Sequence, residues 1–221
     1  MDKTEIRLPA PQLKGRFSLE ETIAERRSVR TFRAEPLTLS QLGQILWAAQ
    51  GLTAGRTLKT VPSAGATYPL EIFVFIGKTS ISASEAQQVS GEIQAGIYHY
   101  EAQSHSLNLH KPGDSRPDLA RAALDQGSVL EAPVDIVICA LYDRTCRTYG
   151  RRGERYTHME VGHAGENIHL QAVALDLATV EVGAFRDEEV RQILGVEEQI
   201  SPLYIMPVGH AAANRANSFD Q

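Results

Sequence analysis

The feature that most restricts how this 221-residue chain can fold is one long predicted helix with apolar side chains on most of its sides. Between about residues 157 and 177, Val161, Ala164 and Ile168 recur at helical spacing, and Leu170 widens the stripe that they form. A helix that is apolar on most sides lies at the centre of its fold or is buried between subunits. The rest of the chain must therefore supply the surfaces that cover this helix.

Short β-rich runs alternate with helical segments along the rest of the chain. Residues 96–109 alternate apolar and polar side chains twice, which predicts a hairpin that turns at Gln103 and Ser104. We expect further strands at 72–76, 134–141, 179–182 and 203–208, and further helices at 18–27, 40–49, 117–131 and 187–194. An antiparallel hairpin among mixed helices and strands favours an α+β fold over a doubly wound parallel sheet.

Two helix boundaries carry specific signals. Ser18 and Glu21 have the spacing of a capping box, which begins the first helix. Gly51 ends the second helix, because glycine is common just after the last helical residue. We expect one domain over residues 18–210, between an N-terminal tail at 1–17 and a C-terminal tail at 211–221.

Charge and composition exclude several classes of partner. The formal net charge is −5, so the whole molecule does not attract nucleic acid or an anionic membrane. No segment approaches the ~20 consecutive apolar residues of a membrane span, and residues 1–15 lack the apolar stretch of a signal peptide. Cys139 and Cys146 are too few for a disulfide framework and are not spaced as a zinc pair. We expect a cytoplasmic protein with incidental thiols and no bound metal.

A basic cluster follows the first predicted helix, where the chain carries Arg26, Arg27, Ser28 and Arg30. The planar fork of arginine matches phosphate oxygens two at a time, so this cluster suits a phosphate group. The alternative is a solvated basic helix end, which is the commoner interpretation of such a cluster by itself.

Two further segments are rich in small residues. Residues 62–69 (PSAGATYP) precede the strand at 72–76, and their small side chains let the backbone approach a flat ligand closely. Val182, Gly183 and Ala184 follow a predicted strand, where a backbone amide can donate to a ring nitrogen without obstruction. For residues 62–69 taken alone, an ordinary tight loop is the favoured interpretation.

In this order, the segments resemble the FMN-dependent nitroreductase superfamily and, within it, the SagB-type branch, which is similar to thiazoline and azoline oxidases. The resemblance runs from about residue 18 to residue 209, and its most specific pieces are RRSVRTF at 26–32, PSAGATYPLEIFVF at 62–75, GIYHY at 96–100, the segment 149–185 and PVGH at 207–210. It implies a three-layer α/β/α fold with a mixed, largely antiparallel sheet. It also implies a homodimer with FMN at the subunit interface, which reduces or oxidises a small organic substrate by hydride transfer through flavin N5, with NAD(P)H as donor.

The resemblance assigns roles to residues by their position. Arg26, Ser28 and Arg30 stand at the positions that hold the FMN phosphate and ribityl chain in the family. Arg27 stands at a neighbouring position that can touch the flavin, and Arg215 at a C-terminal position near the phosphate. The loop that lies along the isoalloxazine ring, from the partner subunit, corresponds to Pro62, Ser63, Ala64 and Gly65. Val182, Gly183 and Ala184 match the stretch whose backbone faces the N5 edge of the flavin in the family.

One position departs from the azoline oxidase pattern. Those enzymes carry a Lys-Tyr pair before a Gly-x-Arg-Gly segment, with an assigned role in dehydrogenating the peptide heterocycle, whereas this chain has Thr148 and Tyr149. A threonine hydroxyl cannot replace an amine as a base near neutral pH. Tyr149 is therefore the catalytic candidate, and it can donate a proton, stack over the substrate or pack in the interface.

Three other interpretations stay open. The long helix carries His163, Glu166 and His169 at steps of three, which suits metal ligands, but such steps lag behind a turn of about 3.6 residues and the side chains diverge. The chain is also compatible with a flavin-binding subunit or an azoline dehydrogenase component of a peptide-modifying complex. A flavin-cleaving enzyme, like those that make the lower ligand of cobalamin, shares the same scaffold.

Overall fold

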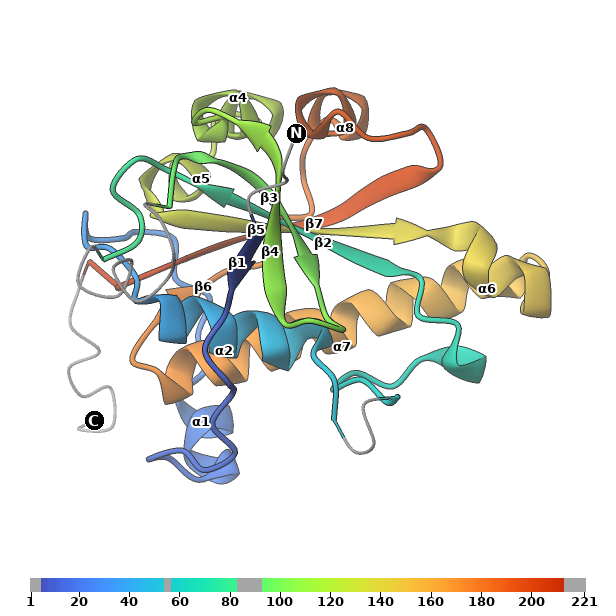
Figure 1. Ribbon diagram of the computed structural model, residues 1–221, viewed down its shortest axis with the longest axis horizontal. Coiled ribbons are helices and arrows are strands. Elements are labelled where there is room, and N and C mark those ends of the chain that lie inside the picture. Colours follow the sequence, from blue (N-terminus) through green and yellow to red (C-terminus); the bar gives the residue numbers. More distant parts are fainter. Residues whose placement is uncertain (1–4, 54–56, 83–92, 213–221) are drawn as a thin grey trace.

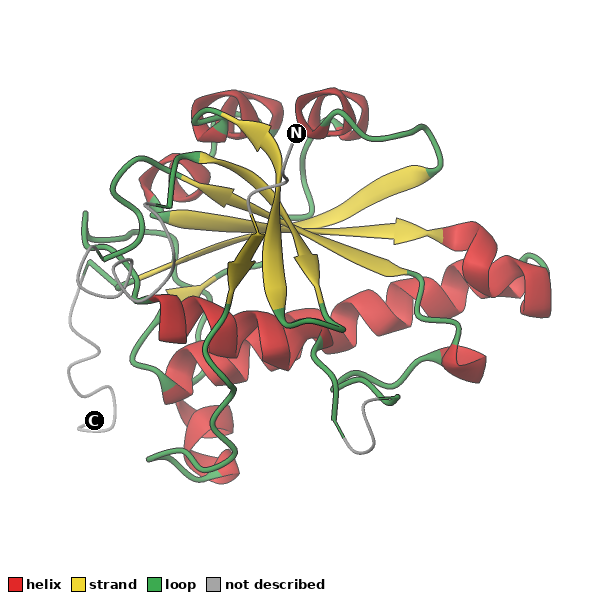
Figure 2. Cartoon of the chain, in the orientation of Figure 1, coloured by secondary structure: helices red, strands yellow, loops and turns green. Residues whose placement is uncertain are grey.

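The structure is a computed structural model that describes residues 5–53, 57–82 and 93–212. In these ranges seven strands form one sheet, and helices cover both faces, so the molecule has three layers (Figures 1 and 2). Helices α2 and α7 lie along one face, with α1 beyond them, and α4, α5 and α8 lie on the other face. This is the three-layer α+β fold that the sequence predicts.

The bounds of the elements in chain order are β1 (Glu5–Arg7), α1 (Leu19–Glu25), α2 (Leu39–Gln50), a 3₁₀ turn (Ala64–Ala66), β2 (Leu70–Ile76), β3 (Gly96–Glu101), β4 (Ser106–Pro112), α4 (Arg116–Ala122), α5 (Gly127–Glu131), β5 (Val134–Leu141), α6 (Tyr142–Tyr149), α7 (Arg152–Ala174), β6 (Ala178–Thr179), α8 (Asp187–Leu194) and β7 (Ile200–Gly209).

The sheet has the strand order β1-β4-β3-β2-β5-β7-β6, and each pairing between these strands is antiparallel. Strand β2 is central, with Phe73 opposite His99 on β3 and opposite Val137 on β5. Two isolated parallel bridges, outside these strand pairings, join Ser28 to Thr179 of β6 and Leu37 to Ile81. The sheet is therefore mixed and largely antiparallel, as expected.

Alternation along β2 divides the core between the two faces of the sheet. Ile72, Val74 and Ile76 belong to the apolar cluster that contains residues of α2 and α7. Phe73 and Phe75 belong to a second cluster, with residues of α4 and α8. Because both faces are covered, the strand reads as a continuous apolar run in the sequence.

The predicted helix boundaries are confirmed where the local chemistry is specific. The Ser18 hydroxyl accepts a bond from the Glu21 amide at 3.1 Å, and the Glu21 carboxylate accepts one from the Ser18 amide at 2.6 Å. Gly51 follows α2, and its amide donates to the Trp47 carbonyl at 2.7 Å. The capping box therefore begins α1 at the predicted place.

Several elements differ from the prediction. Leu124 and Asp125 adopt φ values of 59° and 57°, so the expected helix at 117–131 is divided into α4 and α5. Helix α7 begins at Arg152 instead of Thr157, and α6 was not predicted. Strand β6 has two residues instead of the expected four.

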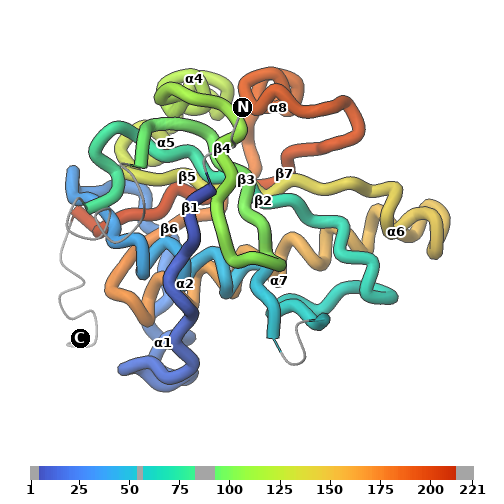
Figure 3. The backbone as a smooth tube through the Cα atoms, in the orientation of Figure 1, coloured from blue at the N-terminus to red at the C-terminus, as the bar shows by residue number. Residues whose placement is uncertain are grey.

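Part of the N-terminal segment, which the sequence predicts to be a tail, belongs to the sheet. Its residues 5–7 form β1, which pairs with 106–108 of β4 at one edge of the sheet. Figure 3 shows the chain then running from β1 past α2 to α1. No helix within the described ranges is long and apolar enough to cross a membrane.

One acidic side chain lies inside the core beside β2 and β7. Asp135 is 0% exposed, and neither of its carboxylate oxygens has a hydrogen-bond partner among the described residues. Burial raises the pKa of Asp135 well above its ordinary value, although the nearby charge of Arg116 opposes the change. The folded protein therefore holds a proton on this carboxyl at pH values where the unfolded chain has lost it.

We expect Asp135→Asn to flatten the dependence of stability on pH. Below about pH 4 the carboxyl is protonated in both states, and as the pH rises the unfolded chain ionises first, so wild type loses up to about 1.4 kcal/mol per pH unit relative to the variant. Urea unfolding from pH 4 to pH 8, at one protein concentration, measures this difference. Parallel curves for the two proteins would show that Asp135 ionises normally in the fold.

Candidate functional site

The basic cluster of the sequence lies beside strand β6. Helix α1 ends at Glu25, and Arg26 is its C-cap. The Val29 amide then donates to the Thr179 carbonyl at 3.0 Å, next to the bridge between Ser28 and Thr179. This pairing places residues 26–30 alongside the start of the segment that leads to Gly183.

The three arginines have different surroundings. The Arg27 guanidinium turns back onto α1 and donates to the carbonyls of Ala24 and Arg26 at 2.8 and 2.7 Å. Arg26 is half-buried and Arg30 is exposed, and neither forms an ion pair with any residue that the structure describes. Arg27 thus caps the helix end, as cations do, while Arg26 and Arg30 are available to an anion.

A buried histidine and a glutamate lie behind Arg26. The His169 Nε2 atom is 2.7 Å from a carboxylate oxygen of Glu181, and the His169 side chain is 1% exposed. The hydrogen bond to His169 lowers the pKa of Glu181 most, and the charge of Arg26 lowers it further. This pair was not predicted from the sequence, although a single acid between Val180 and Val182 in a predicted strand is a usable signal.

The backbone after β6 offers hydrogen-bond donors. Val182 pairs with Ile205 of β7 in both directions, but the amides of Gly183 and Ala184 donate to no atom of the described residues. Both residues are exposed, and Gly183 has no β-carbon to obstruct approach. The Thr179 hydroxyl, buried nearby, is also without a partner in the described part of the chain. These donors and the free guanidiniums fit a ligand that has a phosphate at one end and hydrogen-bond acceptors at the other.

The small-residue loop at 62–65 does not lie beside the basic cluster. Its 3₁₀ turn at 64–66 contacts α6, and the Ser63 hydroxyl accepts a hydrogen bond from the Tyr68 amide at 2.9 Å. Pro62 and Gly65 are exposed, and Ser63 and Ala64 are half-buried.

Helix α7 separates the two clusters. The segment before α1 is tied to the C-terminal end of α7 by an ion pair between Arg16 and Asp176, whereas α6 packs against the N-terminal end (Figure 1). A helix of 23 residues is about 34 Å long. Within one chain, the structure therefore pairs the 26–30 segment with Thr179, which precedes the 182–184 segment, whereas the 62–65 loop lies beside α6 at the other end of α7.

Comparisons with known proteins agree with this geometry. The profile of the nitroreductase family matches residues 23–210. A protein of Methanocaldococcus jannaschii that is named as a nitroreductase is 46% identical over 208 residues, which cover 94% of this chain and 97% of the relative. The chain belongs to the nitroreductase family. Members of this family are flavin-dependent oxidoreductases, and the chain is an oxidoreductase of this kind.

Solved structures show the same fold. The crystal structure of a protein of Ralstonia eutropha JMP134, named as a nitroreductase, superimposes with a TM-score of 0.76 at 26% identity and covers 95% of this chain and 90% of that one. A chain of the Escherichia coli microcin synthetase McbBCD complex with truncated pro-MccB17 bound superimposes with a TM-score of 0.73 at 21% identity. That alignment covers 93% of this chain and 77% of the other, and it shows a shared fold.

In this nitroreductase, Tyr149 lies over the 62–65 loop. A β-carbon placed on Gly65 would be 2.7 Å from the Tyr149 hydroxyl oxygen. The Tyr149 ring packs edge-on against Tyr156 at 5.2 Å and is 38% exposed. The catalytic candidate and the loop therefore belong to one cluster, while Arg215 lies outside the described residues.

The histidines of α7 do not converge. His169 points inward to Glu181, whereas His163 and Glu166 are exposed on the helix. Across the described ranges, no three His, Cys, Asp or Glu side chains are grouped to hold a metal ion.

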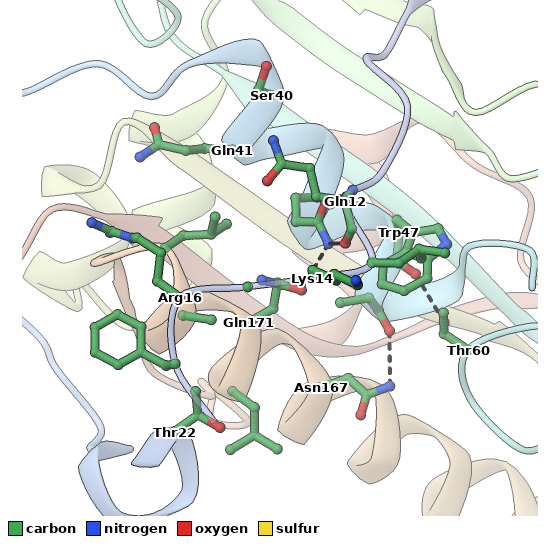
Figure 4. Close-up of a pocket in the computed structure, with 18 of the residues that line it drawn as sticks. Gln12, Lys14, Arg16, Thr22, Ser40, Gln41, Trp47, Thr60, Asn167 and Gln171 are labelled. Carbon is green, nitrogen blue, oxygen red and sulfur yellow. Dashed lines mark hydrogen bonds between the residues drawn. The ribbon is translucent and has the colours of Figure 1, made fainter. Parts of the chain in front are cut away.

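A separate groove of about 840 Å³ lies between the 9–19 segment, α2 and α7, and it contains none of the predicted flavin-binding residues. Its polar groups bond to one another (Figure 4): the Gln44 amide donates to Gln12 and to Gln171, at 3.1 Å each, and Asn167 donates to the Ala48 carbonyl at 3.0 Å. These bonds hold the walls of the groove together, so we do not assign the reaction to it.

We expect Gly65→Ala to destabilise the nitroreductase. Gly65 has φ +60°, where a β-carbon costs about 1–2 kcal/mol, and the new methyl would also press on Tyr149. Urea unfolding at a fixed protein concentration measures the loss. Tyr149→Ala should recover part of it in the double variant, because the contact is then removed. Gly127→Ala is the matched control, since its β-carbon meets nothing nearer than 3.4 Å; an equal loss there would contradict the local explanation.

Proposed function

We propose that this nitroreductase is a homodimeric, FMN-dependent oxidoreductase that reduces or oxidises a small organic substrate with NAD(P)H as electron donor. The observation that carries the proposal is the hydrogen bond between Val29 and Thr179, which pairs the segment of the free guanidiniums with the strand that leads to the free amides. Arg26, Ser28 and Arg30 then hold the phosphate and ribityl chain. When it is bound, FMN supplies the hydride chemistry, so the protein must place and tune it.

The backbone donors act on the ring. In the proposed complex the amides of Gly183 and Ala184 face the N5 edge of the isoalloxazine, and because they belong to a segment fixed by the pairing of Val182 with Ile205, they need no reorganisation. The bond between His169 and Glu181 fixes that carboxylate, whose charge interacts with that of Arg26 although the two side chains form no ion pair. Arg27 contributes by ending α1 at the site.

A second copy completes the proposed site. The 62–65 loop lies too far along α7 to touch a flavin held by Arg26 and Arg30 of the same chain, but a two-fold axis that sets two α7 helices antiparallel brings the partner's loop there. Exposed apolar side chains on this side of the fold support such an interface: Leu13, Leu19 and Ile23 are 81%, 61% and 56% exposed. Tyr149 of the partner subunit then reaches the substrate side of the ring and serves as a proton donor.

The proposed compartment is the cytoplasm. Cys139 and Cys146 are both free thiols, and burial raises the pKa of Cys139, which makes that thiol inert.

A second candidate function is a dehydrogenase component or flavin-binding subunit of a peptide-modifying complex of the SagB type. The observation that favours it is the fold shared with a chain of the microcin synthetase McbBCD complex, which has truncated pro-MccB17 bound. Thr148 is exposed next to Tyr149 and has no basic group. This chain therefore lacks the lysine amine that is expected for oxidation of a peptide heterocycle. Bleaching of the flavin by NADPH without a peptide would favour the first function.

We expect the double variant Arg26→Ala with Arg30→Ala to bind FMN at least about a hundredfold more weakly, because it loses charge-assisted bonds worth about 1.5–3 kcal/mol each. Quenching of flavin fluorescence measures the affinity. Arg121→Ala with Arg186→Ala is the control, since it removes the same charge from exposed ion pairs on the α4–α8 face. If both double variants keep wild-type affinity, the phosphate binds elsewhere.

Mixed dimers test the shared site. Ala64→Glu should block the ring by placing a charged side chain on the loop, while the double arginine variant lacks the phosphate contacts. After subunit exchange, about a quarter of all sites should bind FMN, because half of the dimers are mixed and each then has one intact site. Recovery of no sites would show that both segments serve the same flavin within one chain.

A further inference from the structure

The chain on both sides of the catalytic candidate Tyr149 concentrates positive charge. Figure 1 shows α6 and the start of α7, which carry it, at one end of the molecule beyond the sheet. Residues 147–155 contain one acid, Glu154, and four arginines, here called the arginine cluster: Arg147, Arg151, Arg152 and Arg155. Four positive charges against one negative give this stretch a net charge of +3, in a chain whose formal net charge is −5.

The arginine cluster is not used for contacts within the chain. All four side chains are exposed, and none forms an ion pair or a side-chain hydrogen bond with any residue that the structure describes. Arg144, earlier on α6, shows the contrast: it donates to the Tyr68 carbonyl at 2.9 Å and forms an ion pair with Glu71. Unpaired charges so close together repel one another, and a bound anion would relieve that repulsion.

The arginines also oppose the helix on which they lie. Arg151 is the N-cap of α7 and Arg152 is its first residue, and no capping side chain is present. The N-terminus of a helix carries partial positive charge, so cations there are unfavourable. Arg151 and Arg155 are four residues apart, where like charges on one side of a helix repel. Residues that work against the local structure in this way are expected at functional sites.

The arginine cluster adjoins the proposed reaction site. Tyr156 lies one turn after Arg152 on the same side of α7, and its ring packs edge-on against Tyr149 with centroids 5.2 Å apart. Tyr149 in turn lies over the 62–65 loop, where a β-carbon on Gly65 would be 2.7 Å from its hydroxyl oxygen. A long molecule that meets the flavin beside Tyr149 therefore has the arginines next to the part that extends toward solvent.

We propose that the arginine cluster binds the ribose phosphate that distinguishes NADPH from NADH, so that NADPH is the preferred electron donor. The inference rests on the proposed function, because it requires a nicotinamide donor at the flavin. The two donors share the nicotinamide and the diphosphate bridge, and only NADPH carries a further phosphate on its adenosine ribose. The guanidinium fork binds two oxygens of such a phosphate at once, which is the contact that these unpaired side chains can offer.

The first test compares the two donors on the FMN-loaded, full-length dimer. Wild type should have a higher kcat/KM with NADPH than with NADH. In the double variant Arg151→Ala with Arg155→Ala, the ratio of the two values should fall about tenfold or more, because charge-assisted bonds to one phosphate are lost. The thermal midpoint of the flavin-free variant should not fall, because the substitutions remove repulsion at the start of α7. A lower midpoint would instead show that the arginines stabilise the fold.

A binding measurement separates recognition of the phosphate from turnover. By calorimetry, wild type should bind adenosine 2′,5′-bisphosphate, the phosphorylated half of NADPH, more tightly than adenosine 5′-monophosphate, and the double variant should lose most of this difference. The control Arg121→Ala with Arg186→Ala removes the same charge from the α4–α8 face and should keep the wild-type difference.

The outcomes distinguish this inference from the function on which it rests. A donor ratio that the double variant leaves unchanged would overturn the inference, while FMN binding and the proposed function would stand. If the ratio is unchanged and activity falls with nitrobenzoate but not with uncharged nitrobenzene, the cluster binds an anionic acceptor instead of the donor. Wild-type protein that binds no FMN, or that oxidises neither nucleotide, would overturn the proposed function itself.

Discussion

Helix α7 packs against the sheet, α1, α2 and α6, and every part of the candidate site takes its position from this packing. Its inward residues, such as Val161, Ala164 and Ile168, join the larger apolar cluster. Its C-terminal half places His169 against Glu181 behind the basic segment, and its N-terminal half packs against α6, which contacts the 3₁₀ turn of the loop. A shift of this helix would therefore move both halves of the site.

The sequence predicts those parts of the fold that depend on local chemistry or on regular spacing. The capping box at Ser18, the β2 run and the hairpin are of this kind, because their signals lie within a few residues. Helix α6 carries mostly polar side chains, so it has no periodic apolar stripe from which it could be predicted. It also has no capping side chain that would mark where it begins. The division between α4 and α5 depends on left-handed backbone at Leu124 and Asp125, which neither side chain requires.

For the candidate site, the sequence indicates which segments take part but not how their side chains are used. The cluster at 26–30 lies beside Thr179, which precedes the small residues at 182–184. Arg27 turns back onto α1 because the helix ends just before it. The spacing of apolar residues in the sequence does not reveal the exact end of the helix.

A site divided between the ends of one helix links cofactor retention to protein concentration. Under the proposed arrangement, a lone chain offers the phosphate its arginines but has no loop to cover the ring, so tight binding requires the pair. By mass action, dilution that separates the subunits then also releases the flavin, and added flavin draws the subunits together. In such a protein the cofactor acts as an assembly factor as well as a redox group.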